Sequence, residues 1–260
     1  MVAEPEEQIL LAVAHEAAEA AGTELRARFG QRAAGVHAKS TPTDLVSDAD
    51  FAAEAAIRAV LAERRPNDAI VAEEGGESGE GEIRWVVDPL DGTINFLFGV
   101  PQFAVSVACE NDAGTLAGVV LDPIRDEYFA ATRSGAPTVN GVPISPPQRA
   151  VELDTAMVAT GFAYDSALRV RQAEVLARVL PRIRDIRRAG SAAIDLAWCA
   201  CGRYDAFYER GLHNWDVAAG ALVASRAGLE VRELLASYTL PSGILAAPAG
   251  LIEELLALGL

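Results

Sequence analysis

The chain has 260 residues, of which 51% are hydrophobic and 23% are charged, and so much apolar material excludes a disordered protein. This length provides for one large domain or two closely packed halves. Acidic residues outnumber basic residues by 37 to 22, and the net charge of −15 argues against nucleic acids and anionic membrane surfaces as partners.

The N-terminal part of the chain is predicted to contain two helices joined by a polar segment. Apolar residues recur at three- and four-residue steps over 6–29, which is typical of an amphipathic helix. Residues 31–46 are expected to form a polar loop or hairpin. A second helix is expected over 47–65, because Ser47 and Asp50 at its start fit a capping box.

The middle of the chain is rich in predicted strands. Short apolar runs that end at turn residues indicate strands over 69–72, 83–87, 103–110, 115–121 and 127–131. This spacing is typical of an antiparallel meander. A proline-rich segment over 142–147 is the predicted seam between an N-terminal half, 1–147, and a C-terminal half, 148–260, of one domain.

The C-terminal half alternates between predicted strands and helices. We expect these elements, beginning with a strand, over 155–160, 166–179, 185–188, 191–201, 204–208 and 215–227, followed by a terminal strand and helix. Such alternation indicates an α/β architecture in which helices cover a mixed or partly parallel sheet.

Several features predict a cytoplasmic protein. The three cysteines, Cys109, Cys199 and Cys201, are an odd number and are expected to be reduced and buried. The acidic N-terminal sequence does not resemble a signal peptide. The uncharged stretch 234–252 is long enough to span a membrane, but it contains prolines and glycines and is better explained as loop, strand and helix start.

Four acidic positions lie at predicted strand ends or helix starts, namely Glu73, Asp88, Asp91 and Asp216. Taken singly, each has a structural explanation as a turn, a helix cap or solvated surface. Taken together they indicate a cation site, because clustered carboxylates repel one another. Mg²⁺, bound through a few carboxylates together with substrate phosphate, relieves that repulsion.

The hexapeptide 88–93 has the local chemistry of such a site. Pro89 disfavours helical backbone at Asp88 and is expected to end the preceding strand there. Gly92 permits a tight turn, and Thr93 can begin a short helix whose free N–H groups face an anion.

These residues carry a resemblance to the inositol monophosphatase family. Residues 85–96, WVVDPLDGTINF, resemble its first signature, and residues 214–220, NWDVAAG, resemble its second. Segments 39–47, 188–196 and 202–209 are also similar, so the resemblance extends over nearly the whole chain. It implies a layered αβαβα sandwich with an antiparallel N-terminal sheet and a mixed or parallel C-terminal sheet. It also implies Mg²⁺-dependent hydrolysis of small polyol phosphates, inhibition by lithium and a homodimer.

The resemblance also implies a metal-ligand set. Glu73, Asp88 and the Leu90 carbonyl would hold a first Mg²⁺. Asp88, Asp91 and Asp216 would hold a second, and a third, weaker ion would lie near Glu73. The small phosphate ester is the expected partner of these ions.

Further roles follow from the same resemblance. Thr93, together with Glu73, would orient the attacking water. Asp50 would polarise the Thr93 hydroxyl, serve as a capping residue, or do both. Backbone N–H groups of Gly92 and Thr93 would bind phosphate. The remaining substrate contacts would come from Asp91, Glu209, the backbone around Gly190, Ser191 and Ala192, and Lys39, the only lysine in the chain.

The leading hypothesis is an inositol-1-phosphate phosphatase. Fructose-1,6-bisphosphatase and histidinol-phosphate phosphatase activities are alternatives: a bisphosphate needs a second cationic group, such as Arg187, Arg188 or Arg203, and an amino alcohol phosphate needs an acid such as Glu209. A regulatory partner of the transcription machinery is the alternative from another class.

Overall fold

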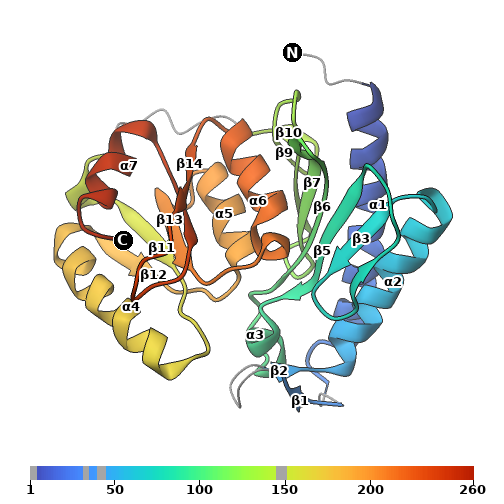
Figure 1. The fold of residues 1–260 in the computed structure, drawn as a ribbon, viewed down its shortest axis with the longest axis horizontal. Helices are drawn as coiled ribbons and strands as arrows, with labels where there is room; N and C mark the ends of the chain where they lie inside the picture. The colour runs from blue at the N-terminus through green and yellow to red at the C-terminus, as the bar shows by residue number, and fades with distance from the viewer. Residues whose placement is uncertain (1–4, 32–34, 40–44, 145–150) are drawn as a thin grey trace.

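Helices α1 (Pro5–Arg28) and α2 (Asp48–Arg64) pack together and form one outer layer of the protein (Figure 1). The computed structural model describes residues 5–31, 35–39, 45–144 and 151–260. Both helices have the predicted bounds to within one residue, and Ser47 forms the predicted capping box with Asp50. Between them, strands β1 (His37–Ala38) and β2 (Leu45–Val46) pair antiparallel, as the hairpin alternative predicts.

The first sheet lies against these helices. Its eight strands are ordered β10-β9-β8-β7-β6-β5-β3-β4. Their bounds are β3 (Ala69–Ala72), β4 (Gly76–Ser78), β5 (Arg84–Asp91), β6 (Ala104–Asn111), β7 (Gly114–Asp122), β8 (Glu127–Thr132), β9 (Thr138–Val139) and β10 (Val142–Pro143). The expectation of a purely antiparallel sheet is wrong at one place, because β3 and β5 are parallel. The chain turns back through β4 on the outer edge of β3 and therefore enters β5 in the direction of β3.

Strand β5 is longer than the sequence predicts. It does not end at Asp88 but continues to Asp91. Asp88 lies opposite Ser106 and Asp91 lies opposite Ala104, so the register shifts between them. Pro89 falls inside this bulge, where its missing N–H removes no regular hydrogen bond of the sheet. The bulge therefore lets the strand carry both acidic residues to its end.

A central helix layer separates the first sheet from a second one. It consists of α5 (Ala192–Ala200) and α6 (Asn214–Arg226). The second sheet is ordered β12-β11-β13-β15-β14, with strands β11 (Met157–Thr160), β12 (Asp185–Arg187), β13 (Ala206–Arg210), β14 (Glu230–Leu234) and β15 (Gly243–Ala247). Its β12, β11 and β13 strands are parallel and the other pairs are antiparallel, which confirms the predicted mixed sheet.

Two further helices cover the outer face of the second sheet. They are α4 (Ser166–Val179) and α7 (Ala249–Leu256), accompanied by the short 3₁₀ helices Leu153–Thr155 and Leu180–Arg182. The layers therefore run helix, sheet, helix, sheet, helix, and the predicted αβαβα sandwich is confirmed (Figure 1). The predicted seam 142–147, and with it the division at 147/148, falls partly on residues 145–150, outside the described residues.

The sequence prediction misses the short strands β4, β9 and β10 of the first sheet and one strand of the second sheet. A single terminal strand is expected, but two are present, because β14 precedes β15. Strand β14 forms the edge of the second sheet and carries Glu230, Arg232 and Glu233. Charged side chains are common on edge strands, where they oppose pairing with other chains, and they hide the apolar alternation by which a strand is recognised.

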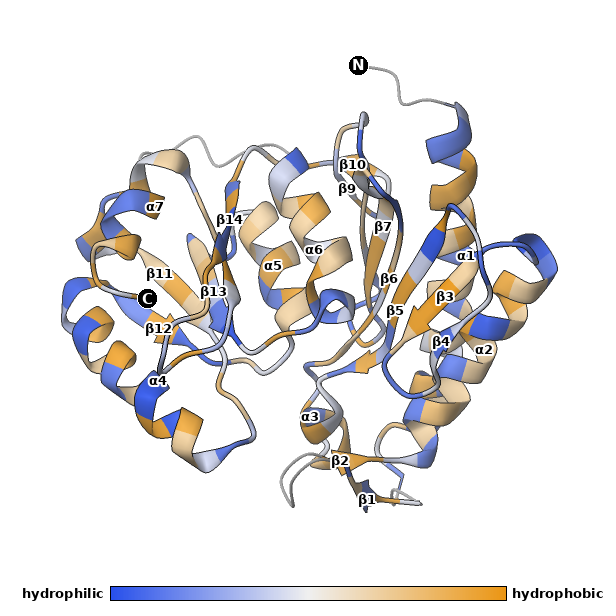
Figure 2. Cartoon of the chain, in the orientation of Figure 1, coloured by the Kyte–Doolittle hydropathy of each residue, from blue (hydrophilic) through white to orange (hydrophobic). Residues whose placement is uncertain are grey.

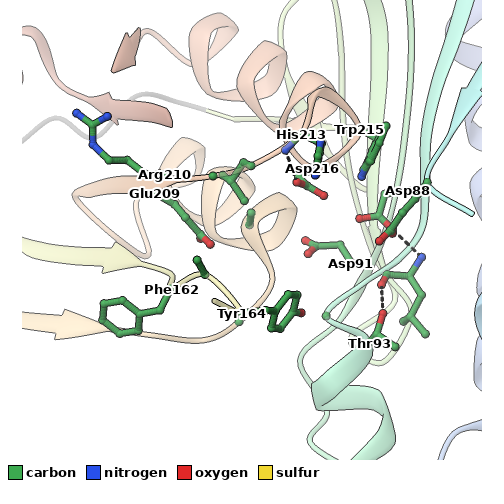
Figure 3. Close-up of a pocket in the computed structure, with 18 of the residues that line it drawn as sticks. Asp88, Asp91, Thr93, Phe162, Tyr164, Glu209, Arg210, His213, Trp215 and Asp216 are labelled. Carbon is green, nitrogen blue, oxygen red and sulfur yellow. Dashed lines mark hydrogen bonds between the residues drawn. The ribbon is translucent and has the colours of Figure 1, made fainter. Parts of the chain in front are cut away.

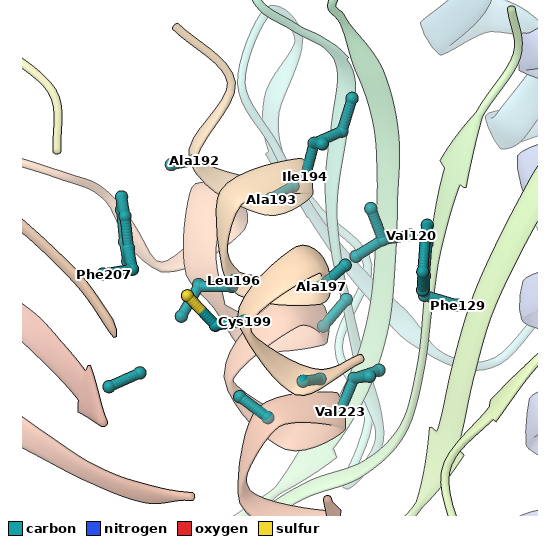
Figure 4. Packing of buried hydrophobic residues seen from close by; sticks show 14 of the residues in the cluster. Val120, Phe129, Ala192, Ala193, Ile194, Leu196, Ala197, Cys199, Phe207 and Val223 are labelled. Carbon is teal, nitrogen blue, oxygen red and sulfur yellow. The ribbon is translucent and has the colours of Figure 1, made fainter. Parts of the chain in front are cut away.

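Small residues let the central helices approach the first sheet closely. A Cβ atom at Gly118 of β7 would lie 2.8 Å from the Cα atom of Ala219 in α6. Figure 4 shows Val120 and Phe129 of the first sheet beside Ile194 and Ala197 of α5. Apolar strands lie inside the layers, whereas the outer helices carry many hydrophilic residues (Figure 2). Among the described residues, no helix combines the length and the apolar character needed to cross a bilayer.

Candidate metal and phosphate site

A cavity of about 410 Å³ opens between the end of β5 and the facing ends of β11 and β13 (Figure 3). Acidic side chains converge on it from segments that are far apart in the sequence. Glu73 follows β3, Asp88 and Asp91 end β5, and Asp216 lies in the first turn of α6. The structure thus brings together all four carboxylates that the sequence singles out, and Figure 3 shows the three aspartates around one space.

Backbone and hydroxyl donors hold the two carboxylates of β5. Asp88 is 2% exposed, and its Oδ1 atom accepts a hydrogen bond of 2.9 Å from the Leu90 N–H. Asp91 Oδ2 accepts bonds of 2.7 Å from both the Ser191 hydroxyl and the Ala193 N–H. Asp91 therefore joins the end of β5 to the beginning of α5 across the cavity.

Asp216 is positioned by the start of α6. Its Oδ2 atom accepts a hydrogen bond of 2.6 Å from the His213 N–H, which is the contact expected of an acidic residue in the first helical turn. The His213 ring stacks on Trp215 with ring centroids 4.5 Å apart. Asp216 was expected as the N-cap residue of this helix, but the N-cap is His213 and Asp216 occupies the third helical position. Its carboxylate still lines the cavity.

Glu73 and Lys39 form an ion pair at the cavity wall. Lys39 Nζ lies 2.8 Å from Glu73 Oε1 and also contacts the Glu74 carboxylate. Burial alone would lower the pKa of Lys39, but these two carboxylates outweigh it and raise the pKa. The turn after β3 is fixed by Glu54, which accepts hydrogen bonds from the N–H groups of Glu74 and Gly75 at 2.9 Å.

The concentrated negative charge changes the acidity of the three aspartates. Burial raises the pKa of Asp91 to about 6 and that of Asp216 to about 8, and it raises the pKa of Asp88 well above its usual range. Repulsion from neighbouring carboxylates, Glu73 among them, adds to each shift. In the described part of the chain, no lysine or arginine forms an ion pair with any of these three aspartates.

This donor set fits a hard divalent cation by its chemistry. Every donor is an oxygen atom, and the charge of the aspartates is not balanced by protein cations. Within the described residues, however, no three acidic, histidine or cysteine side chains stand close enough together to coordinate one ion. Asp88, Asp91 and Asp216 each accept a hydrogen bond from a backbone N–H.

Gly92 and Thr93 form the tight turn that follows β5. Gly92 has φ 99°, and a Cβ atom there would lie 3.0 Å from the Gln102 carbonyl oxygen and 3.2 Å from that of Gly190. Only glycine meets both conditions without strain. The short helix α3 (Thr93–Leu97) then begins at Thr93, as predicted, and both residues line the cavity.

Asp50 serves two contacts at once, one with each oxygen. Its Oδ2 atom accepts bonds from the Ser47 N–H and hydroxyl at 2.9 and 2.8 Å, and its Oδ1 atom accepts a bond of 2.9 Å from the Thr93 hydroxyl. Asp50 is fully buried behind Thr93 and does not line the cavity. The capping explanation and the Thr93 partnership are therefore both present in the structure.

The opposite wall of the cavity holds most of the predicted substrate contacts. Gly190, Ala192 and Glu209 line it, and burial raises the pKa of Glu209 to about 8. Ser191 does not line it: the residue is 1% exposed, and its hydroxyl donates to Asp91 at the start of α5. Ser191 thus holds the carboxylate of a metal-ligand candidate. Because it is buried and does not line the cavity, it is not placed to contact substrate hydroxyls.

Some residues of the site are missed by the sequence prediction. Residues 162–165, after β11, form a wall that includes Phe162 and Tyr164 (Figure 3). The position of this loop after a parallel strand could have identified it, since loops at the carboxyl ends of parallel strands line ligand clefts. Asn95 is also missed. Its side-chain amide donates to the Gln102 carbonyl at 2.6 Å and the Ala189 carbonyl at 2.9 Å, which ties the turn after β5 to the opposite wall.

Comparison with known proteins identifies a family and solved structures of the same fold. The family model described as the inositol monophosphatase family matches residues 6–258. An inositol-1-monophosphatase SuhB of Mycobacterium tuberculosis is 43% identical over 88% of this chain and 83% of that protein. A Nus factor SuhB of Pseudomonas aeruginosa is 45% identical over 75% of this chain and 74% of that protein. The crystal structure of an extragenic suppressor protein suhB from Bartonella henselae superposes with a TM-score of 0.88 at 34% identity, covering 96% and 97% of the two chains.

Proposed function

The chain belongs to the inositol monophosphatase family, and we propose that it is a Mg²⁺-dependent phosphatase that releases phosphate from small polyol monoesters. Inositol 1-phosphate is the substrate that we place first. One observation carries this proposal. Carboxylates from three separate parts of the chain meet the Gly92–Thr93 turn at a single cavity, a combination that neither helix capping nor turn formation requires.

Two groups of oxygen donors would hold the metal ions. Glu73, Asp88 and the Leu90 carbonyl would bind one Mg²⁺, and Asp88, Asp91 and Asp216 would bind another. A third, weaker ion would lie near Glu73. The chemistry that bound Mg²⁺ supplies is positive charge, which activates water and stabilises the departing alcohol oxygen. Lys39 limits the negative charge at Glu73 when substrate phosphate enters.

Thr93 would orient the attacking water. A hydroxyl has one proton to donate and two lone pairs to offer. The Thr93 proton is directed to Asp50 or to the Leu90 carbonyl, at 2.9 and 3.1 Å, so a lone pair remains for a water molecule. Glu73 would accept a hydrogen bond from the same water. The N–H groups of Gly92 and Thr93 would bind phosphate oxygens at the start of α3.

The alcohol part of the substrate would lie against the opposite wall. Asp91, Glu209 and the backbone of Gly190 and Ala192 are the groups there that suit hydroxyl recognition. The relative from Mycobacterium tuberculosis, which is named an inositol-1-monophosphatase, supports inositol 1-phosphate as the first choice. Fructose 1,6-bisphosphate and histidinol phosphate are the alternatives to be measured beside it.

Phosphate release tests the proposal directly. The chain is incubated with each of the three esters in Mg²⁺, in Mg²⁺ with lithium, and in excess chelator. We expect release that needs Mg²⁺ and falls in lithium. Asp91→Asn should abolish most of it, whereas Asp185→Asn, a matched change on β12 outside the cavity, should leave it unchanged. Undiminished hydrolysis in chelator would refute the metal assignment.

A role in transcription is the second candidate. The relative from Pseudomonas aeruginosa carries the name Nus factor, and this is the observation that favours such a role. The test is whether the chain forms a stable complex with bacterial RNA polymerase and its elongation factors. A complex that survives Asp91→Asn would establish a function independent of phosphate hydrolysis, and the absence of any complex would remove this candidate.

We also propose a homodimer in the cytoplasm. The three cysteines are unpaired, two of them buried, which suits a reducing compartment. Light scattering after size-exclusion chromatography measures the mass directly, and a mass near 27.4 kDa would show a monomer instead.

A further inference from the structure

In the described part of the chain, one arginine of the cavity wall forms neither a hydrogen bond nor an ion pair with another residue. Three arginines were candidates for a substrate contact, and the structure separates them. Arg187 bonds to Asp185 at 2.5 Å, and Arg203 bonds to Glu127 while lying 5.0 Å from the Trp198 ring centroid. Neither lines the cavity, and Arg188 does.

Within the described residues, Arg188 has no hydrogen-bond or ion-pair partner, and its side chain is exposed. The other basic side chains of the cavity differ in this respect. Lys39 is paired with Glu73, and the Arg210 guanidinium donates to backbone carbonyls, including that of Leu260 at 2.7 Å. An arginine without a protein partner in a substrate cavity offers donor N–H groups to a ligand.

The guanidinium lies beside the wall assigned to the alcohol part of the substrate. A Cβ atom at Gly190 would be 2.4 Å from Arg188 Nη1, so the guanidinium folds over the Gly190 backbone. It also faces Glu209, because its positive charge acts to lower the pKa of that carboxyl against the larger effect of burial.

A neighbouring acid does not neutralise Arg188. Both carboxylate oxygens of Asp195 are buried without a hydrogen-bond partner in the described part of the chain. Burial raises the pKa of Asp195 well above its usual range, which disfavours its charged form. Because neither Asp195 oxygen bonds to Arg188, the guanidinium remains available to the cavity.

We propose that Arg188 determines substrate specificity by donating hydrogen bonds to hydroxyl or anionic oxygens of the alcohol part and by repelling ammonium groups. This inference rests on the proposed phosphatase function and narrows it. The substrate class is polyol phosphates whose alcohol part bears oxygen groups alone, and amino alcohol phosphates are disfavoured. Guanidinium is suited to this task because it is always charged and holds several donors in one plane.

The test compares two monoesters, inositol 1-phosphate and histidinol phosphate, through kcat/KM in Mg²⁺. We expect the wild-type chain to prefer inositol 1-phosphate. Arg188→Ala should lower kcat/KM for inositol 1-phosphate about tenfold, the usual scale for losing a hydrogen bond to a charged donor, and should raise the value for histidinol phosphate. Arg188→Lys keeps the charge and should retain the discrimination against the ammonium substrate.

Arg187→Ala is the matched control, because it removes the adjacent arginine, which lies outside the cavity. It should change neither value, and thermal unfolding checks that all variants fold. A ratio of the two kcat/KM values that Arg188→Ala leaves unchanged, or a wild-type preference for histidinol phosphate, overturns the specificity role while leaving the phosphatase function in place. A wild-type chain that hydrolyses neither ester refutes the proposed function, and the specificity role with it.

Discussion

A substitution at Gly161 can displace the side chain of one substrate-binding residue, Glu209, without mutating that residue. Gly161 directly follows β11, and a Cβ atom there would lie 2.0 Å from Glu209 Oε2. Its backbone is outside the left-handed region, so alanine fits the main chain. The substitution Gly161→Ala should therefore act on the Glu209 carboxylate and on little else.

The size of the displacement follows from the structure. Ordinary contacts with a Cβ atom begin at about 3.4 Å, so the nearest carboxylate oxygen must move by at least about 1.4 Å. The carboxylate is the end of a flexible side chain, and the added methyl group should cost about 1–3 kcal/mol of stability. Catalytic sites tolerate errors of roughly 0.5 Å, so recognition by Glu209 should be lost. We expect kcat/KM to fall about 10- to 100-fold, mainly through KM.

A double-mutant cycle separates this mechanism from general damage. Steady-state phosphate release is measured for wild type, Gly161→Ala, Glu209→Ala and the double variant. If the alanine methyl acts only by moving the carboxylate, the double variant should match Glu209→Ala, because no carboxylate remains to be moved. Additive losses, or an unaffected Gly161→Ala enzyme, would refute the reasoning.

Three further predictions concern the metal side of the cavity. Asp91→Asn should lower kcat more than about 100-fold with a small change in Tm, because asparagine keeps an oxygen for the Ser191 hydroxyl but removes the charge. Thr93→Ala should lower kcat about 100-fold and raise KM much less, since Thr93 acts on the attacking water. Without metal, Tm should fall as the pH rises from 5 to 8. Burial raises the pKa of Asp216 and of Glu209 to about 8, so their stabilising contribution is complete below the unfolded value near 4 and is lost as the pH approaches 8. Mg²⁺ should reduce that fall.

Each of these predictions has a clear contrary result. Near-normal turnover in Asp91→Asn would remove Asp91 from the metal site. A Thr93→Ala enzyme with unchanged kcat would exclude Thr93 from positioning the water. A Tm in chelator that rises between pH 5 and 8, measured by differential scanning fluorimetry, would contradict the assigned acidities.

Most helices and strands can be predicted from the sequence because they depend on local patterns, whereas their layered arrangement was expected from the family resemblance. Apolar periodicity marks the helices and most strands, and Asp88 and Asp91 stand out as acidic residues beside a proline and a glycine. Local patterns do not predict the bulge at Pro89. Whether a proline ends a strand or sits in a bulge depends on the neighbouring strand, here the register of Asp88 with Ser106.

Residues that depend on tertiary contacts were harder to identify. The backbone of Ser191 was expected to contact substrate, yet the residue is buried and its hydroxyl donates to Asp91, 100 positions away in the chain. Tyr164 belongs to the cavity only because the second sheet brings the end of β11 toward β5. Arg188 was one of three equal candidates until the partners of Arg187 and Arg203 were visible. Contacts between residues far apart in the chain produce no periodic pattern in a sequence.

The hydrogen bonds from Ser191 and Ala193 to Asp91 make the first turn of α5 sensitive to ligand binding in the cavity. One carboxylate oxygen caps that turn, so a ligand that draws electron density from the carboxylate weakens the bond to the Ala193 N–H. Amide hydrogen exchange at Ala193 should therefore register occupancy of the cavity from inside the central helix layer, with no label or chromophore added to the protein.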